Sequence, residues 1–214
     1  MERILLPQGN TKGVAMLAAV AKAIMVLRAG GVILYPTDTL YGLGVDTFNE
    51  EALLKLYAIK GRSEEKPVHS IVADLEMAER YADVSAAARK LAERFLPGPL
   101  TLLLQKKDSV PDFALRGSDL FGIRIPENEF CLALARAFDA PYTTTSANKS
   151  GLKPERNVDA ILEQLGEAGN SIDLIIDAGE LPERAPSSVV EARGEKAILV
   201  REGAISKEEL RPFL

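Results

Sequence analysis

A short apolar run that ends in a loop of hydroxyls constrains this chain most. Residues 32–34 are Val-Ile-Leu, and residues 35–44 read Tyr-Pro-Thr-Asp-Thr-Leu-Tyr-Gly-Leu-Gly. The run predicts a buried strand, because Pro36 cannot donate to a sheet ladder and favours the end of a strand. Gly42 and Gly44 permit backbone geometry or a close approach that other residues resist. Threonines commonly cap turns, and loops on a rigid scaffold often carry function, so this loop is both a candidate turn and a candidate site.

The rest of the chain mixes helical and strand patterns without strict alternation. Helices are expected at residues 11–28, 50–60, 75–96 (one or two), 127–138 and 158–165. Further strands are expected at residues 68–73, 100–105, 121–125, 142–145, 174–177, 188–191 and 197–201. Asn49 before two glutamates is typical of a helix start, and Gly30 and Gly61 are typical of helix ends. This order favours an α/β fold, with a mixed parallel and antiparallel sheet flanked by helices, over a Rossmann fold or a barrel.

Length and composition indicate one domain spanning residues 1–214. The chain is 47% apolar, and no linker, charge run or repeat divides it. Its net charge of −5 argues against a protein that coats nucleic acid, although a local basic cleft stays open. The N-terminus lacks the pattern of a secretory signal, and the apolar stretch at 14–27 is too short to span a membrane. A cytoplasmic protein without membrane contact is expected.

The chain has a single cysteine, Cys131, and a single histidine, His69. An intramolecular disulfide framework, a cysteine-based zinc site and a histidine-rich metal site are therefore excluded. Cys131 falls in an apolar helical pattern and is expected to be buried. For His69, a structural place beside a strand is the commoner case and a catalytic role is the alternative.

Three cations, Lys60, Arg62 and Lys66, leave a predicted helix for a loop that ends at a proline. Cations near a helix C-terminus are favoured by the helix dipole by about 0.3–1 kcal/mol, which is a sufficient structural reason for them. The same cations also suit a polyphosphate, which needs several donors and charge neutralisation. Because two neighbouring glutamates offset part of the charge, composition leaves both interpretations open.

Arg124 lies inside the apolar run at residues 121–126. Burying an unpaired charge is very costly, so this arginine needs a partner. A structural salt bridge would supply one, and so would a substrate carboxylate, which the guanidinium suits through its bidentate geometry. Ser146 and Asn148 follow three threonines, and such small polar residues either close turns or hold an anion.

Several common catalytic signatures are absent. No Gly-x-x-x-x-Gly-Lys-Ser/Thr sequence occurs, no Gly-x-Gly-x-x-Gly follows a strand, and there is no Gly-x-Ser-x-Gly elbow. With one histidine, a serine triad is not expected. Any ATP site in this chain must be of another kind.

Seven motifs in order resemble the YrdC-like family of threonylcarbamoyl-AMP synthases, in its short single-domain form. The resemblance runs from about residue 30 to residue 204. Besides the loop at 35–44, the motifs are Lys60-Gly61-Arg62 with Lys66-Pro67, Pro97-Gly98-Pro99-Leu100-Thr101, Gly122-Ile123-Arg124-Ile125-Pro126, Ser146-Ala147-Asn148-Lys149-Ser150-Gly151, Ser187-Ser188-Val189-Val190 and Val200-Arg201-Glu202-Gly203-Ala204.

The resemblance implies a YrdC-like fold with an open, positively charged cleft. It implies a nucleotidyltransferase that forms threonylcarbamoyl-AMP and pyrophosphate from L-threonine, bicarbonate and ATP. ATP contacts are implied at Lys60, Arg62, Lys66, Ser146, Asn148 and Arg201. Threonine contacts are implied at Thr39, Arg124, Thr144 and Ser187. Lys60 and Arg62 would position substrates and neutralise charge, no certain catalytic group is implied, and Mg²⁺ would arrive with ATP rather than in a site of the protein's own. Other proteins would then move the threonylcarbamoyl group to adenosine 37 of certain tRNAs.

The sequence departs from the family pattern at four positions. Ser63 replaces a usual proline, and Ser188 replaces a usual threonine. Leu120 replaces a threonine that often contacts the nucleotide, and Pro154 replaces a serine that commonly touches ATP, so no contact is assigned to either.

Two other functions are weighed against the synthase. Hydrogenase maturation proteins contain a related domain that handles carbamoyl-adenylate, but they are much longer and carry cysteine-rich zinc segments. The other alternative is a module that binds double-stranded RNA, tRNA or the ribosome through the same basic cleft, for which 6% aromatic residues and net acidity give little support. An RNA-binding protein gains nothing from a buried guanidinium, so Arg124 distinguishes the two.

Overall fold

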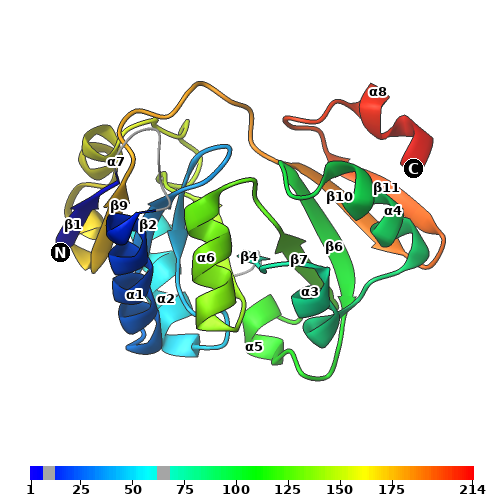
Figure 1. Cartoon of the computed structure of the whole chain (residues 1–214), viewed down its shortest axis with the longest axis horizontal. Coiled ribbons are helices and arrows are strands. Elements are labelled where there is room, and N and C mark those ends of the chain that lie inside the picture. Colours follow the sequence, from blue (N-terminus) through cyan, green and yellow to red (C-terminus); the bar gives the residue numbers. More distant parts are fainter. Residues whose placement is uncertain (7–12, 62–67) are drawn as a thin grey trace.

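One twisted sheet runs through the residues that the computed structural model describes, which are 1–6, 13–61 and 68–214. Its strands are β1 (Glu2–Leu5), β2 (Ile33–Pro36), β3 (Tyr41–Gly44), β4 (His69–Ile71), β5 (Ala82–Asp83), β6 (Leu100–Lys106), β7 (Leu120–Arg124), β8 (Tyr142–Ser146), β9 (Leu174–Asp177), β10 (Ser188–Arg193) and β11 (Lys196–Arg201). The strand order is β1-β9-β2-β3-β8-β4-β7-β6-β10-β11, and β5 pairs with β6. Figure 1 shows the two termini at opposite ends of this arrangement.

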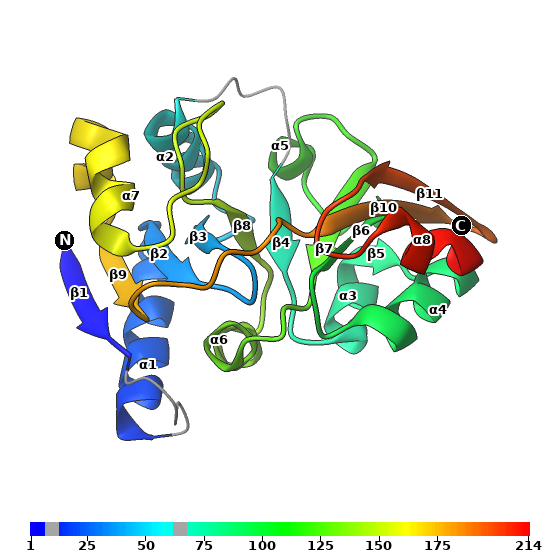
Figure 2. The same ribbon diagram turned by 90° about the horizontal axis from the view of Figure 1, so that it is seen from above.

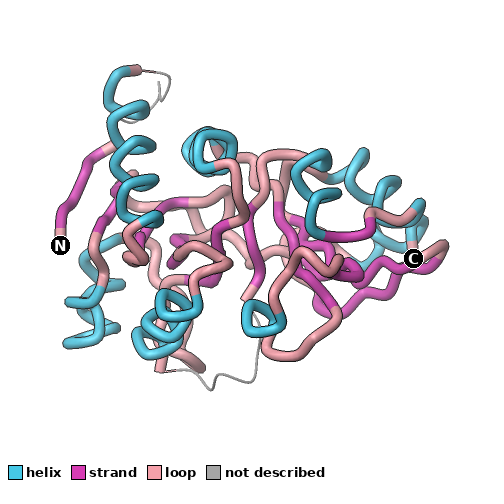
Figure 3. Tube along the Cα trace, turned by 90° about the horizontal axis from the view of Figure 1, so that it is seen from below, coloured by secondary structure: helices cyan, strands magenta, loops and turns pink. Residues whose placement is uncertain are grey.

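Helices cover both faces of the sheet. They are α1 (Val14–Arg28), α2 (Glu50–Lys60), α3 (Leu75–Tyr81), α4 (Ala86–Phe95), α5 (Asp112–Leu115), α6 (Glu129–Phe138), α7 (Val158–Leu165) and α8 (Lys207–Leu210), with 3-10 turns η1 (Gly166–Ser171) and η2 (Arg211–Phe213). Figure 2 shows α1, α6, α3 and α4 on one side of the strands and α2, α7 and α5 on the other. The tube in Figure 3 shows the same division from the opposite direction.

The sheet has mixed direction, as the sequence predicted. The pairs β1/β9, β2/β9, β4/β7 and β6/β10 are parallel. The pairs β2/β3, β3/β8, β4/β8, β5/β6, β6/β7 and β10/β11 are antiparallel. The α/β fold class is therefore confirmed.

The largest difference from the sequence-based expectation lies at residues 35–44. The segment after Pro36 was expected to be a loop, yet β3 returns antiparallel beside β2 and pairs Pro36 with Tyr41. Only residues 37–40 remain as the loop of this hairpin. Two glycines in β3 concealed the strand, because glycine is usually unfavourable in strand interiors. The strand β1 and the short helix α5 also went unpredicted.

The start and end of α2 follow the sequence signals. The Asn49 side chain accepts a hydrogen bond from the Ala52 N–H at 3.0 Å, and Gly61 ends the helix with φ +56°. The backbone N–H of Ser150 donates to the carbonyl of Lys60 at 2.9 Å. The capped end of α2 therefore places Lys60, the last residue of the helix, beside the segment that follows β8.

An aromatic cluster fixes the centre of the sheet. The hydroxyl of Tyr35 donates to the carbonyl of Thr143 at 2.9 Å, and the ring of Tyr35 packs edge-on against Tyr142 with centroids 5.5 Å apart. The hydroxyl of Tyr142 donates to the carbonyl of Cys131 at 3.1 Å. Cys131 is fully buried on α6, as predicted, and burial raises the pKa of its thiol to about 12. The strands that carry the hydroxyl-rich segments are therefore held rigidly by the core.

None of the helices in the described parts of the chain has the length and apolar character needed to span a membrane.

The lack of a side chain at Gly44 is expected to stabilise this packing. A Cβ at Gly44 would lie 2.8 Å from the Tyr35 ring and 2.9 Å from the Thr143 carbonyl, whereas a Cβ at Gly42 would lie 3.3 Å from its nearest atom. Gly44→Ala should therefore lower the free energy of unfolding by about 1–3 kcal/mol, the usual cost of overpacking. Urea denaturation of Gly44→Ala beside Gly42→Ala measures this. An equal loss in both variants would contradict the steric argument.

Candidate functional site

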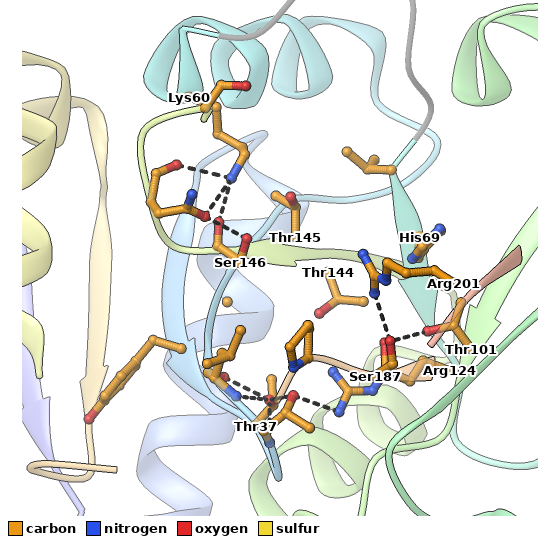
Figure 4. Close-up of a pocket in the computed structure, with 18 of the residues that line it drawn as sticks. Thr37, Lys60, His69, Thr101, Arg124, Thr144, Thr145, Ser146, Ser187 and Arg201 are labelled. Carbon is orange, nitrogen blue, oxygen red and sulfur yellow. Dashed lines mark hydrogen bonds between the residues drawn. The ribbon is translucent and has the colours of Figure 1, made fainter. Parts of the chain in front are cut away.

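The ends of β3, β7 and β8 surround a cleft of about 370 Å³. All eight described residues that the sequence proposed for the site line it: Thr39, Lys60, Arg124, Thr144, Ser146, Asn148, Ser187 and Arg201. They come from α2, from the β2–β3 loop, from β7, β8 and β11, and from the segments after β8 and before β10. Figure 4 labels six of them around the cleft, namely Lys60, Arg124, Thr144, Ser146, Ser187 and Arg201. The structure thus brings together residues that the sequence placed far apart.

The remaining sequence-based assignments fall elsewhere. Arg62 and Lys66, expected at ATP, and Ser63 lie outside the described residues. Neither Leu120 nor Pro154 is among the described residues that line the cleft. Ser188 is fully buried, and its hydroxyl donates to the carbonyl of Ile205 at 2.6 Å.

Arg124 has the buried partner that its burial demanded. Its Nη2 donates to Oδ1 of Asp38 and, at 2.9 Å, to the hydroxyl of Thr39. The two charged side chains are only 7% and 4% exposed. Nε of Arg124 and Oδ2 of Asp38 are buried without a hydrogen-bond partner. The guanidinium is therefore anchored through one nitrogen, and the sequence did not identify Asp38 as the anchor.

The threonines of the hairpin loop form the turn that presents this anchor. The hydroxyl of Thr37 donates to the carbonyl of Leu40 at 2.7 Å and accepts from the N–H groups of Thr39 and Leu40 at 3.1 Å. Side-chain bonds of this kind to nearby backbone close turns. The interpretation of the loop as a turn is therefore confirmed, and the turn also places Thr39 against Arg124. A contact of this loop with a ligand stays a prediction.

Lys60 is tied to the segment after β8. Lys60 is only 3% exposed. Its Nζ donates to the carbonyl of Ser146, to the carbonyl of Asn148 at 3.0 Å and to Oδ1 of Asn148 at 3.3 Å. The amide nitrogen of Asn148 donates to the carbonyls of Lys149 and Leu152 at 3.0 and 2.7 Å. These contacts shape the loop, so the turn-forming interpretation of Asn148 also holds, and contact with ATP stays a prediction for these residues.

A second polar group lies at the start of β10. The hydroxyls of Thr101 and Ser187 are 2.9 Å apart, and Nη2 of Arg201 donates to the carbonyl of Ser187 at 2.7 Å. Burial, and then repulsion by the charge of Arg124, lowers the pKa of Arg201. The two guanidinium groups therefore act on the same part of the cleft.

Thr37, Thr101 and His69 also line the cleft, and the sequence analysis assigned no ligand contact to them. Thr37 and Thr101 lie inside two of the seven motifs. Their spacing from Thr39 and from the Pro-Gly-Pro segment could therefore have identified them as candidate cleft residues. His69 begins β4, and a Cβ at Gly122 would lie 2.5 Å from its ring. Gly122 therefore leaves room for the imidazole, which supports the structural interpretation of His69.

The donors that the described residues contribute to the cleft do not make a magnesium site of their own. Its described lining has hydroxyls, one amide and the cations Lys60, Arg124 and Arg201, but no carboxylate. No group of three or more metal-ligating side chains occurs within residues 1–6, 13–61 and 68–214. Since Mg²⁺ prefers carboxylate and phosphate oxygens, these residues suit anions better than a bare cation.

The family model Sua5/YciO/YrdC, described as "Telomere recombination", matches residues 25–203. The chain belongs to this family. A relative from Methanocaldococcus jannaschii, itself only provisionally named a threonylcarbamoyl-AMP synthase, is 39% identical over 181 residues, covering 85% of this chain and 84% of the relative. The threonylcarbamoyl-AMP synthase of Pyrococcus abyssi is 33% identical over 189 residues, covering 88% of this chain but only 55% of that protein.

Solved structures of Sua5/YciO/YrdC proteins share the fold. The crystal structure of P. abyssi Sua5 in complex with L-threonine superimposes with a TM-score of 0.85 at 29% identity, covering 100% of this chain and 60% of that one. The crystal structure of Escherichia coli YciO superimposes with a TM-score of 0.82 at 27% identity, covering 100% of this chain and 98% of that one. The chain therefore matches one relative over nearly its full length and another over little more than half.

The buried pair of Asp38 and Arg124 is expected to be strongly coupled. Asp38→Ala leaves a buried guanidinium without its counter-ion and should cost about 3–5 kcal/mol of unfolding free energy, less where cleft water reaches it. Adding Arg124→Met removes the uncompensated charge, so the double variant should lose less than the sum of the single losses by about 1–3 kcal/mol. Chemical denaturation of the three variants measures this coupling.

The exposed pair of Lys153 and Glu183 is the matched control, since its side chains are 85% and 75% exposed. Glu183→Ala should change stability by no more than about 0.5 kcal/mol. Additive losses at Asp38 and Arg124 would contradict the buried-pair argument.

Proposed function

We propose that this chain is an L-threonylcarbamoyladenylate synthase, which forms threonylcarbamoyl-AMP and pyrophosphate from L-threonine, bicarbonate and ATP. One observation carries the proposal. The guanidinium of Arg124, which is paired with Asp38, lines a cleft in which all the other described charged residues are cations. An arginine held this way suits a carboxylate ligand through its planar, fixed donors. Membership of the Sua5/YciO/YrdC family and the threonine complex of P. abyssi Sua5 support the choice of an amino acid.

The amino-acid end of the cleft is built around Arg124. Its guanidinium would hold the α-carboxylate of L-threonine. The buried hydroxyls of Thr39, Thr144 and Ser187, which line the same cleft, would contact the rest of the amino acid. Buried polar groups that must be paired discriminate strongly against ligands that lack the matching group.

ATP would occupy the region of Lys60, Ser146, Asn148 and Arg201. The ammonium of Lys60 lies among the carbonyls of this loop, so it would act on phosphate as a fixed positive charge behind the loop. Arg62 and Lys66 are proposed to add direct phosphate contacts. Mg²⁺ would be carried by the phosphates, and no step is assigned to it.

The reaction requires positioning more than a covalent nucleophile. The amine of threonine takes up bicarbonate to give a carbamate, and a carbamate oxygen then displaces pyrophosphate at the α-phosphate of ATP. Holding the carbamate in line with the α-phosphate and neutralising the developing negative charge are the contributions that these residues supply. The enzyme would therefore be a nucleotidyltransferase, and its product would pass to the proteins that modify adenosine 37 of tRNA.

Residues 1–214 are proposed to carry this activity as one domain. This chain covers 55% of the longer P. abyssi synthase and 98% of the E. coli YciO chain. Whether the shorter extent suffices for synthesis is what the assay decides.

Pyrophosphate release tests the proposal. Purified protein with ATP, Mg²⁺ and bicarbonate should release pyrophosphate only when L-threonine is present. Arg124→Ala should lower kcat/KM for threonine by about 30- to 4000-fold, as expected when one partner of a buried charge interaction worth 2–5 kcal/mol is removed. Arg136→Ala, an exposed arginine on α6, is the control and should behave as wild type.

Retention on double-stranded RNA, measured with the same variants, separates the alternative function. The synthase predicts that Arg124→Ala loses turnover and leaves any RNA retention unchanged. If the wild-type protein releases no pyrophosphate under any of these conditions but retains RNA, the synthase assignment is wrong.

A further inference from the structure

The segment between β9 and β10, residues 178–187, forms a strap from one half of the sheet to the other. Figure 2 shows this strap in orange, crossing over the strands. At its start, the N–H of Ala178 donates to the hydroxyl of Tyr41 at 2.9 Å. At its end, the N–H of Ala204 donates to the carbonyl of Pro186 at 2.8 Å. The strap is therefore fixed to the body of the protein at both ends.

The middle of the strap is held by one arginine. Residues 182–186 are exposed, and within the described parts of the chain the backbone of the first four makes no hydrogen bond with other backbone groups. Nη1 of Arg184 donates to the carbonyl of Asp38 at 2.7 Å. The ion pair of Lys153 with Glu183 adds little, because both side chains are largely exposed. Arg184 therefore makes the principal connection between the middle of the strap and the β2–β3 loop.

A cavity of about 430 Å³ lies beside this connection. Asp38 and Thr39 line it from the β2–β3 loop, and Arg184 and Ala185 line it from the strap. Loop and strap thus face each other across a cavity rather than in a packed contact. Close packing fixes the separation of most neighbouring segments in a protein. Here a directed hydrogen bond from Arg184 has to fix it instead.

Each side of the connection carries a residue of the amino-acid end of the cleft. On the loop, Thr39 follows Asp38 and accepts a hydrogen bond from Arg124 at 2.9 Å. On the strap, Ser187 lies three residues after Arg184 and lines the same cleft. Arg184 itself is not among the described residues that line the cleft. It therefore acts on this end of the cleft through the two segments that it joins.

We propose that Arg184 is a positioning residue for the amino-acid substrate, because it fixes the distance between Thr39 and Ser187. This rests on the proposed synthase function, in which both hydroxyls contact L-threonine. With the hydrogen bond intact, loop and strap are held in the arrangement that binds the amino acid. Without it, only a fraction of the free enzyme has that arrangement, and the apparent affinity falls by the same fraction.

The expected effect falls on KM for L-threonine. Arg184→Gln should raise this KM by about 3- to 10-fold, the size expected for one hydrogen bond. A bound amino acid restores the arrangement, so kcat should stay within about twofold. The KM for ATP should stay within about threefold, because Ser146 and Asn148 belong to other segments. Arg184→Lys keeps a cationic donor and should restore most of the affinity for threonine.

Ionic strength separates positioning from attraction between charges. Arg184 is exposed, so any direct pull of its charge on the threonine carboxylate would be screened by salt. The ratio of the threonine KM in Arg184→Gln to that in wild type should therefore persist from about 0.05 to about 0.5 M NaCl. A ratio that falls to one in the higher salt would overturn the positioning role.

Hydrogen exchange tests the connection without any substrate. In Arg184→Gln, backbone N–H groups of residues 178–187 and 37–40 should exchange about 3- to 10-fold faster than in wild type. Arg80→Gln is the matched control. Arg80 is also an exposed arginine that bonds another segment, with Nη2 donating to Oδ1 of Asp139 at 2.8 Å, and it does not line the cleft. This variant should leave both exchange rates and the threonine KM unchanged.

The outcomes separate the positioning role from the function. If wild type turns over but Arg184→Gln has an unchanged threonine KM, the positioning role is wrong and the synthase stands. Unchanged exchange in both segments, or a fall in kcat with an unchanged KM, would overturn it as well. If wild type shows no turnover that depends on threonine, the proposed function itself fails, and the positioning role fails with it whatever the exchange rates are.

Discussion

The buried ion pair between Asp38 and Arg124 is the interaction on which the architecture of the cleft depends. It joins the β2–β3 hairpin to β7, two segments that are 86 residues apart in sequence. Because an unpaired guanidinium is very costly to bury, β7 cannot carry Arg124 at 7% exposure unless the hairpin loop closes over it. The turn made by Thr37 sets the position of that loop. The wall of the cleft is therefore specified by electrostatics as much as by apolar packing.

The other cations of the cleft are organised differently. Lys60 is surrounded by backbone and amide oxygens of the segment after β8, and Arg201 binds a backbone carbonyl. Neutral backbone and amide groups contact both of these charges. Groups that are held in place in this way need little reorganisation when charge develops during a reaction. This suits a chemistry in which carboxylate, bicarbonate and triphosphate must be brought together.

Much of the local structure could be predicted from the sequence, because short-range rules decide it. Asn49 and Gly61 delimit α2 by capping and by left-handed geometry, and the apolar period around Cys131 placed it inside α6. The strand β3 was missed, since its glycines oppose strand propensity and are tolerated only because the Tyr35 ring lies against them. Tertiary packing here overrides the low strand propensity of the two glycines.

For the site, the sequence by itself determined which side chains are available: the hydroxyls at 37–39, the cations at 60, 124 and 201, and the small polar residues after β8. Their residue types already indicate anion chemistry, because donors and positive charge are intrinsic to the side chains. Only the tertiary structure decided their partners. It assigned Asp38 to Arg124, Asn148 to Lys60 and Ser187 to Thr101. The members of each pair lie more than 80 residues apart. Strand order, register and the packing of α2 on the sheet, which no local pattern encodes, bring them within hydrogen-bonding distance.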